Sequence, residues 1–300
     1  MGDAIQFYNR YTQQIEDEAV YGDGFLRFAY QTLPGRALLP FIARNAAFSR
    51  WYGWRMAKPK TREKIAPFLK TYGIDPAEFK REPNEFASFN EFFIRELKPG
   101  ARPVDPDPDA VAFPADGRHL AAPDVSQMES FFVKGQRFDL KALLGGDAKL
   151  ADRFARGAAV LSRLCPVDYH RFHFPAPCRP PATEVLNGDY FSVNPIALRQ
   201  RLAYLWENKR TLCRLETERF GLILMLEIGA TCVGSIQQTY APGAETEKGA
   251  EKGYFEFGGS SVILLFEPGA VALSADLVEH SAQCREVYAK MGDRMGTAAA

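Results

Sequence analysis

The sequence predicts an α+β protein in which a helical N-terminal region is followed by a mainly antiparallel β core. Early in the chain, apolar residues recur at helical spacing in four segments: 5–18, 24–33, 37–57 and 61–72. From residue 111 onward, short apolar or alternating runs lie between Gly, Pro, Asn and Asp residues, which is typical of strands joined by turns. The two patterns indicate two regions of different architecture.

The boundary between the regions falls in a Pro- and Asp-rich connection. Residues 88–117 move from a short helix into this connection, so we divide the chain into a helical, membrane-associating region (1–105) and a β-rich region (106–300). Within the second region, ALRQRLAYLWENKR (197–210) is the one clear helix candidate.

Composition narrows the class of protein. The formal net charge is zero, which gives no support to nucleic-acid binding. The five cysteines form no CxxC pair, so we expect a reduced cytosolic chain without a disulfide frame or a zinc site. The N-terminus lacks the apolar run of a secretory signal. The longest apolar run, 221–234, is interrupted by Glu227, and we therefore expect no membrane-spanning helix.

The stretch from Phe25 to Lys70 is basic and aromatic. It holds ten Arg or Lys residues against one acid, Glu63, which is a local net charge of +9. Aromatic side chains such as Phe41, Phe48 and Trp51 alternate there with cations, as in helices that lie in a bilayer interface. The alternative is a helix packed on the core with a solvated basic face, which amphipathicity alone favours.

The segment GYFEFGGSSVILLFEPG (253–269) places two glycines and two serines before an apolar run. The simplest interpretation is a turn that leads into a strand. A phosphate-binding loop is disfavoured because neither a helix nor a Lys follows the serines. A third interpretation is chemical, since Ser260 can attack the carbonyl of Gly259 if that flexible peptide is bent, giving an ester in place of the peptide bond.

Two histidines lie close together in CPVDYHRFHFP (165–175). His170 and His173 would face opposite sides of a regular strand, so that one could enter a site while the other packs. A metal site is disfavoured because only Asp168 lies at a supporting position. An aromatic core strand that happens to contain histidines is the plainer alternative.

A third segment, FPADGR (113–118), supplies Asp116 at an expected turn. Taken alone, this is an ordinary turn aspartate. Together, an Asp, a His and a Ser on separate elements are the parts of an activated-serine site, with an orienting acid, a base and a nucleophile. Because Ser260 opens a strand and lacks the GxSxG pattern of a hydrolase elbow, the combination favours a reaction of the chain on its own backbone.

The segments ADG, DYHRFHFP and GYFEFGGSSVILLF resemble the three signature segments of the phosphatidylserine decarboxylase family. FNEFFIREL, GDYFSVNPIAL and EIGATCVGSIQQTY are also similar to that family, and the similarity runs from about residue 5 to about residue 293. Most members carry Thr after the Gly-Ser pair, where this chain has Ser261.

The resemblance implies a proenzyme that cuts itself between Gly259 and Ser260. Ser260 corresponds to the nucleophile, His173 to the general base and Asp116 to the acid that orients the base. The cut gives fragments 1–259 and 260–300 and converts Ser260 into a pyruvoyl group, the covalent cofactor. This group decarboxylates phosphatidylserine to phosphatidylethanolamine through a Schiff base. His170 corresponds to a substrate-binding residue, and no metal is implied.

The resemblance also implies partners and a location. They are phosphatidylserine, anionic membrane lipid and a heterodimer of the two cleaved chains, with a homodimer left open and no nucleic acid. The chain is expected to lie peripherally on the cytoplasmic face of the cell membrane, which favours the interfacial interpretation of the basic stretch. The alternatives are a decarboxylase for a soluble amino acid, a membrane-binding protein without activity, and a conventional serine hydrolase.

Overall fold

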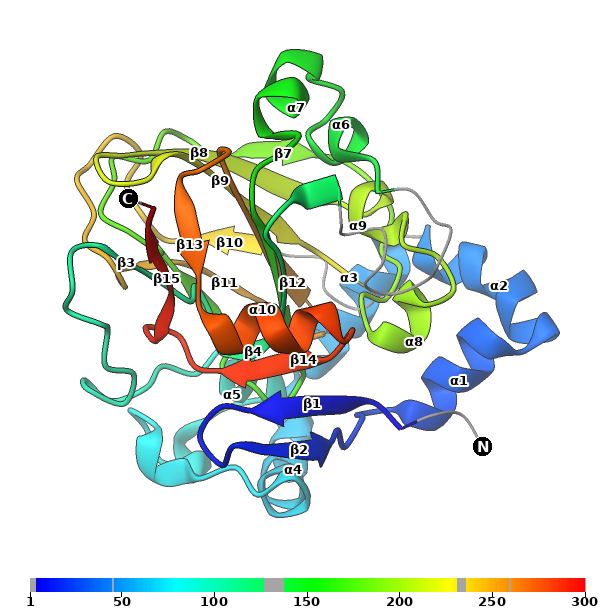
Figure 1. Ribbon diagram of the computed structural model, residues 1–300. Coiled ribbons are helices and arrows are strands. Elements are labelled where there is room, and N and C mark those ends of the chain that lie inside the picture. Colours follow the sequence, from blue (N-terminus) through cyan, green and yellow to red (C-terminus); the bar gives the residue numbers. More distant parts are fainter. Residues whose placement is uncertain (1–3, 45, 127–137, 231–235, 259, 300) are drawn as a thin grey trace.

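A nine-stranded sheet forms the centre of the protein (Figure 1). The computed structural model describes residues 4–44, 46–126, 138–230, 236–258 and 260–299. All neighbouring strands of the large sheet are antiparallel except β1 and β14, which are parallel. The strand order is β2 (Gln14–Asp17), β1 (Gln6–Asn9), β14 (Glu286–Ala289), β4 (Gly117–Ala122), β5 (Ala159–Leu164), β12 (Ser260–Phe266), β9 (Gly221–Ile228), β8 (Arg210–Thr217) and β7 (Glu184–Leu186).

Two smaller sheets complete the β structure. Each has three strands, and together with the large sheet they confirm the prediction of a mainly antiparallel β core after residue 110. One sheet has the order β10 (Ile236–Gln238), β11 (Glu251–Phe255), β6 (Arg171–His173), and the other has the order β13 (Val271–Leu273), β15 (Arg294–Ala298), β3 (Ala110–Ala112).

The early part of the chain is helical from residue 23 onward, as three of the four segments predicted. The helices are α1 (Asp23–Gln31), α2 (Leu33–Ala43), α3 (Ala46–Met56), α4 (Ile65–Tyr72) and α5 (Phe89–Phe93), with 3-10 turns at Pro59–Lys64, Pro76–Glu78 and Pro83–Glu85. Pro34 and Gly35 lie in the first turn of α2, where the Thr32 side chain accepts a hydrogen bond from Gly35 N. A Cβ on Gly35 would lie 2.0 Å from Phe28 O, so only glycine permits this tight α1–α2 turn.

The helical prediction for residues 5–18 is wrong, because this segment is the β1–β2 hairpin. Gln13 adopts a left-handed φ of 56° at the turn, and Phe7 is buried while Gln6 is exposed, which is the alternation of a strand. Strand β1 pairs with β14 near the C-terminus. An isolated helix of this length is marginal, whereas a strand that joins an open sheet edge gains both ladder bonds and burial.

The single helix predicted at 197–210 is also wrong. The segment forms two short helices, α8 (Pro195–Leu198) and α9 (Tyr204–Glu207), and then enters strand β8 at Arg210. The buried Asn208 explains the ending, because its side chain bonds to the backbones of Phe191 and Gly229 and holds the chain against the sheet. Helices α6 (Leu140–Leu143), α7 (Ala148–Phe154) and α10 (Ala275–Ala282) were not expected from the sequence.

The central strands β4, β5 and β12 of the large sheet are buried on both faces. Along β12, Val262 and Leu264 point into one apolar cluster, while Ile263 and Leu265 point into the other. The cluster with Val262 and Leu264 also includes residues of the two small sheets, and the cluster with Ile263 and Leu265 lies under α1, α2 and α8. A third cluster, made largely of phenylalanines from α4 and α5, packs around Phe257, just before β12.

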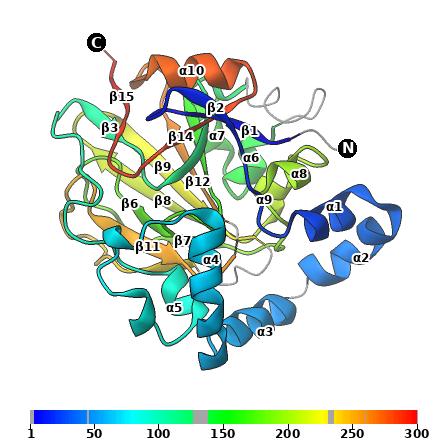
Figure 2. The same ribbon diagram turned by 90° about the horizontal axis from the view of Figure 1, so that it is seen from below.

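Helices α1, α2 and α3 follow one another along one side of the molecule, as the two views of Figures 1 and 2 agree. Figure 2 shows α1 beside α8, α2 next to α1, and α3 near α4 and α5. None of the helices in the described ranges combines the length and the apolar character that a membrane-spanning segment needs.

Candidate active site

Ser260 is the first residue of β12, as the sequence predicted. It pairs with Leu164 of β5, and its side chain is fully buried. Ser260 Oγ lies 3.4 Å from Nδ1 of His170. Gly259 lies outside the described residues, but its neighbour Gly258 has a φ of 144°, which favours glycine. The hydroxyl at the predicted cut is therefore held against an imidazole inside the protein.

The hydrogen bonds of His170 define its tautomer. Nε2 lies 2.8 Å from the carbonyl oxygen of Cys165, so Nε2 carries the hydrogen and Nδ1 is left to accept from Ser260. The ring stacks on Phe93 with the centroids 3.8 Å apart. Burial lowers the pKa of His170 to about 3, and the nearby Arg95 cation acts in the same direction. His170 is therefore neutral near pH 7, and its surroundings resist the charged form.

His173, at the end of β6, has different surroundings. Its Nδ1 lies 2.9 Å from the carbonyl oxygen of Gly249, and its buried Nε2 has no hydrogen-bond partner among the described residues. Burial lowers the pKa of His173, but the bond to Gly249 and the carboxylates of Glu251 and Asp116 act against this shift. Of the two imidazoles, His173 thus has the neighbours that can stabilise a positive charge.

Asp116 is buried immediately before β4. Its carboxylate accepts bonds from Arg102, with Nη2 at 2.6 Å from Oδ2, and from the backbone N of Met291 at 2.9 Å. Within the described part of the chain, no hydrogen bond joins Asp116 to either histidine or His173 to Ser260. The structure thus brings Ser260 to His170, and the roles given to His173 and Asp116 remain predictions.

Two arginines at the site were not singled out from the sequence. Arg102 holds Asp116 and also bonds to Glu78. Arg95 is 4% exposed, and its guanidinium lies over the rings of both Phe79 and Phe92. Burial lowers the pKa of Arg95 to about 10, which still leaves it charged at pH 7. Both arginines lie in segments similar to the family. The chain has many cationic residues, however, and the sequence does not show which of them contact the site.

A buried ionic cluster fixes the segment that holds His170. Arg118 Nη1 lies 2.7 Å from both carboxylate oxygens of Asp168, and Asp168 in turn accepts from the backbone N of Cys165 at 2.7 Å. Arg163 bonds to Glu18 and Glu286, each at 2.5 Å. Buried charges of this kind are stable only when they are paired, so breaking any of these ion pairs is costly. The cluster therefore fixes the segment that places the Cys165 carbonyl beside His170.

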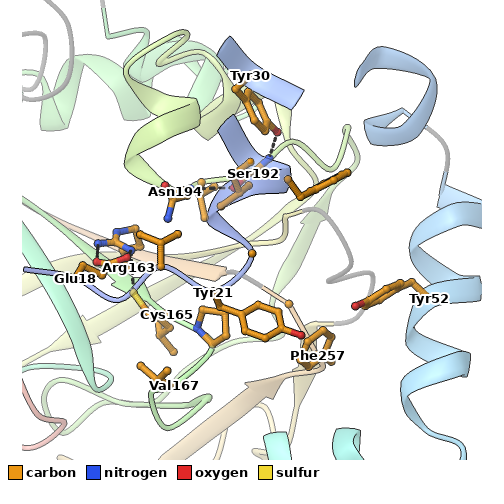
Figure 3. A pocket seen from close by; sticks show the side chains of 18 of the residues that line it. Glu18, Tyr21, Tyr30, Tyr52, Arg163, Cys165, Val167, Ser192, Asn194 and Phe257 are labelled. Carbon is orange, nitrogen blue, oxygen red and sulfur yellow. Dashed lines mark hydrogen bonds and ion pairs between the residues drawn. The ribbon is translucent and has the colours of Figure 1, made fainter. Parts of the chain in front are cut away.

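A mainly apolar pocket of about 370 Å³ lies next to the start of β12 (Figure 3). Tyr52 of α3 stands on one side of it, and the Glu18–Arg163 pair stands on the other. The residues around the predicted cut contribute Phe257, Gly258, Leu164 and Cys165, and helices α1 to α3 contribute Phe25, Leu26, Tyr30, Leu39, Ile42 and Phe48. The pocket therefore joins the helical region to the candidate site.

Phe257 anchors the chain just ahead of the predicted cut. Its backbone N bonds to Asn90 Oδ1 at 3.0 Å, and its ring lies 4.8 Å from that of Phe93. Phe93 is the same ring that stacks on His170. The contacts of Phe93 therefore help to fix the position both of the His170 imidazole and of the backbone that leads to Ser260.

Comparison with known proteins is consistent with this site. The family described as "Phosphatidylserine decarboxylase" matches residues 89–297. A phosphatidylserine decarboxylase proenzyme of Chlamydia caviae is 44% identical over 97% of this chain and 97% of its own length. Proenzymes of the same name from Chlamydia pneumoniae and Fusobacterium nucleatum subsp. nucleatum are 43% and 41% identical, each over 97% of this chain and 96% and 97% of their own lengths. The extent of these matches shows that the chain belongs to the phosphatidylserine decarboxylase family.

Proposed function

We propose that this chain cuts itself at Gly259–Ser260 and then decarboxylates phosphatidylserine with a pyruvoyl group made from Ser260. The observation that carries the proposal is the buried hydroxyl of Ser260, placed at the first position of a central strand and 3.4 Å from a neutral imidazole. Family membership makes the protein a decarboxylase that is made as a proenzyme.

Self-cleavage needs a base for the Ser260 hydroxyl. In the proposed step, the oxygen attacks the carbonyl carbon of Gly259, the peptide nitrogen takes up a proton, and an ester replaces the amide. Loss of the α-proton of residue 260 then expels the Gly259 carboxylate by β-elimination. Water releases ammonia from the dehydroalanine and leaves the pyruvoyl group.

We assign the base role to His173 and the contact with Ser260 before the cut to His170. His173 Nε2 is free of partners among the described residues, and Asp116 and Glu251 favour its charged form. Arg102 orients the Asp116 carboxylate through its paired bonds. His170, which Arg95 disfavours as a cation, suits the later reaction, where a neutral imidazole beside residue 260 can bind the substrate.

The pyruvoyl group supplies an electron-withdrawing carbonyl that takes up the electron pair released as carbon dioxide leaves. The residues of this chain bind and shield the headgroup around that carbonyl. His170, with Phe93 stacked on its ring, contacts residue 260, and Leu164 and Phe257 line the neighbouring pocket. Exclusion of water by these side chains favours loss of charge from the substrate carboxylate.

The fold supports a heterodimer of the two cleaved chains. Fragment 260–300 contains β12, which lies between β5 and β9, and β14, which lies between β1 and β4. Both strands are therefore paired on each side with strands of fragment 1–259. Separation of the fragments would expose these ladders and two apolar clusters, so we expect the fragments to part only on unfolding.

The direct test of the proposal is the mass of the purified protein under denaturing conditions. We expect two polypeptides, of 259 and 41 residues, with a pyruvoyl group in place of an amine at the start of the small one. The same preparation should convert phosphatidylserine to phosphatidylethanolamine, and borohydride, which reduces the carbonyl, should abolish this activity. An intact chain that stays intact on incubation would contradict the proposal.

We further propose that α1, α2 and α3 rest on an anionic bilayer, as a peripheral protein does. Seven large apolar side chains there are exposed, namely Phe25, Phe28, Leu33, Leu38, Phe41, Trp51 and Trp54. Lys58 and Arg55 lie over the rings of Trp54 and Trp51, which is the pairing of aromatic rings and cations that suits a headgroup layer. The apolar pocket behind these helices offers the lipid a route to residue 260.

Replacing Leu33, Phe41 and Trp54 together by Ser should weaken vesicle binding at least about tenfold, because each buried apolar side chain contributes roughly 1.5–3 kcal/mol. These three are the most exposed of the set, at 83%, 77% and 60%. Phe48 is a poorer choice because it lines the pocket. Co-sedimentation with phosphatidylserine vesicles measures the effect, and self-cleavage should be unchanged. Val185→Ser, an exposed apolar residue on β7, is the matched control. Unchanged binding of the triple variant would refute the docking surface.

A further inference from the structure

Ser260 and Ser261 are adjacent, but their side chains point to opposite faces of β12. Ser260 faces the side of Val262 and reaches His170. Ser261 faces the side of Ile263, where its partners in the ladder are Arg163 of β5 and Ile228 of β9. The second hydroxyl is therefore turned away from the imidazole that contacts the first.

The side chain of Ser261 is fully buried, and its Oγ has no hydrogen-bond partner among the described residues. Its cross-strand neighbour Arg163 cannot satisfy it, because every nitrogen of that guanidinium already donates to Glu286, Glu18 or Cys165 Sγ. A buried hydroxyl without a partner carries a free-energy cost that an alanine would avoid. Among the described residues, nothing thus uses the hydroxyl of Ser261 before the cut.

The face that carries Ser261 is also the face of the pocket. Arg163 and Glu18 line the pocket wall, and Tyr30, Leu39 and Val193 belong both to the pocket and to the apolar cluster that contains Ile263. Gly258 lines the pocket immediately before the cut. Cleavage removes the covalent link at the start of β12, beside Ser261, so that ligand atoms can reach this end of the strand.

We propose that Ser261 is a substrate-positioning residue that acts only after self-cleavage, by donating a hydrogen bond to the carboxylate of the phosphatidylserine headgroup. This inference rests on the proposed function. Residue 261 follows the residue to which the headgroup becomes attached, so its hydroxyl is within one residue of the reacting carbon. An ionised carboxylate is the strongest acceptor that the headgroup brings close to that carbon.

The test compares Ser261→Ala, Ser261→Thr and the parent protein. Ser261→Ala should cleave itself to the same extent and carry a full complement of pyruvoyl by mass, yet kcat/KM for phosphatidylserine should fall about tenfold to hundredfold. Ser261→Thr keeps the hydroxyl and should stay within a few-fold of the parent. In the uncut Ser260→Ala background, adding Ser261→Ala should leave Tm unchanged or raise it, because no bond is lost.

Ser281→Ala is the matched control, since Ser281 is equally buried but its Oγ accepts from Ala121 N at 2.8 Å. It should lower Tm and leave kcat/KM unchanged. Covalent trapping of lipid with cyanoborohydride then identifies the contact. Ser261→Ala should trap phosphatidylserine less efficiently than the parent does. It should trap phosphatidylethanolamine, which lacks the carboxylate, with the same efficiency as the parent.

Three results would overturn the inference. They are parental kcat/KM in Ser261→Ala, failure of Ser261→Ala to cleave itself, and equal loss of trapping with both lipids. None of these results contradicts the proposed function, which fails if the parent and Ser281→Ala proteins stay intact or do not decarboxylate the lipid.

Discussion

Replacing Ser260 by Ala should leave the chain as a single polypeptide of 300 residues without decarboxylase activity. The hydroxyl oxygen is the nucleophile of the cut, and the same residue becomes the cofactor, so both reactions are lost together. Loss of a nucleophile of this kind lowers a rate by about 10⁴-fold or more. Intact mass after incubation for a day, and release of carbon dioxide from labelled phosphatidylserine, measure the two losses.

The fold should survive this change. The contact between Ser260 Oγ and His170 is long, at 3.4 Å, and the residues around it remain packed. We therefore expect a Tm within a few degrees of the uncut parent and unchanged circular dichroism. Ser261→Ala is the companion variant, because it removes the neighbouring hydroxyl and should still be cut. A Ser260→Ala chain that appears as two fragments would show that another bond or another nucleophile is used.

Local patterns predicted the start of β12 correctly for a physical reason. Two glycines, two serines and a continuous apolar run describe a bend that enters a strand buried on both faces, and each of those features acts over a few residues. The hairpin at 6–17 was not predicted because β14, with which β1 pairs, lies more than 270 residues away in the chain. No short window of the sequence contains both β1 and β14, and the spacing of apolar residues in the segment alone predicts a short helix.

For the candidate site, too, the sequence predicted the residues but not the contacts between them. Ser260, His170, His173 and Asp116 stand in distinctive segments, so the sequence could select them. Which histidine contacts Ser260 could not be predicted from spacing in the sequence. The contact of His170 depends on the conformation of loop 165–170, which is stabilised by hydrogen bonds between Cys165 and Asp168 and between Cys165 and His170. Arg102 was missed for a related reason. Its role exists only because the chain at 101–103 passes beside Asp116, which a one-dimensional pattern does not record.

Comparing His170→Asn with His173→Asn should separate the two reactions. His173→Asn should block self-cleavage by about a hundredfold or more, because the neutral imidazole that can accept the Ser260 proton is lost. His170→Asn should still cleave, more slowly, and the cleaved product should be the poorer decarboxylase. The rates come from denaturing gels over time and from product formation on phosphatidylserine micelles.

The pH dependence of cleavage gives a second reading of the same step. A base works only when neutral, and burial lowers the pKa of His173 below its usual value near 6.5. Cleavage should therefore stay constant from pH 8 down to pH 6.5 and decline only below that, as His173 takes up a proton. Removing the opposing charge with Asp116→Asn should lower the pKa of His173 further and move the decline to lower pH, while slowing the plateau rate because the imidazolium is less stabilised.

The opposite outcome is equally informative about the geometry. If His173→Asn cleaves at the parental rate while His170→Asn stays uncut, then the contact between Ser260 and His170 is the catalytic one. Nε2 of His173, which has no partner among the described residues, then serves the lipid instead. In that case the plateau should extend toward pH 3, since burial lowers the pKa of His170 to about 3, and Asp116→Asn should leave the profile in place. The two assignments thus predict different pH limits for one bond cleavage, and the charges around each imidazole are what separate them.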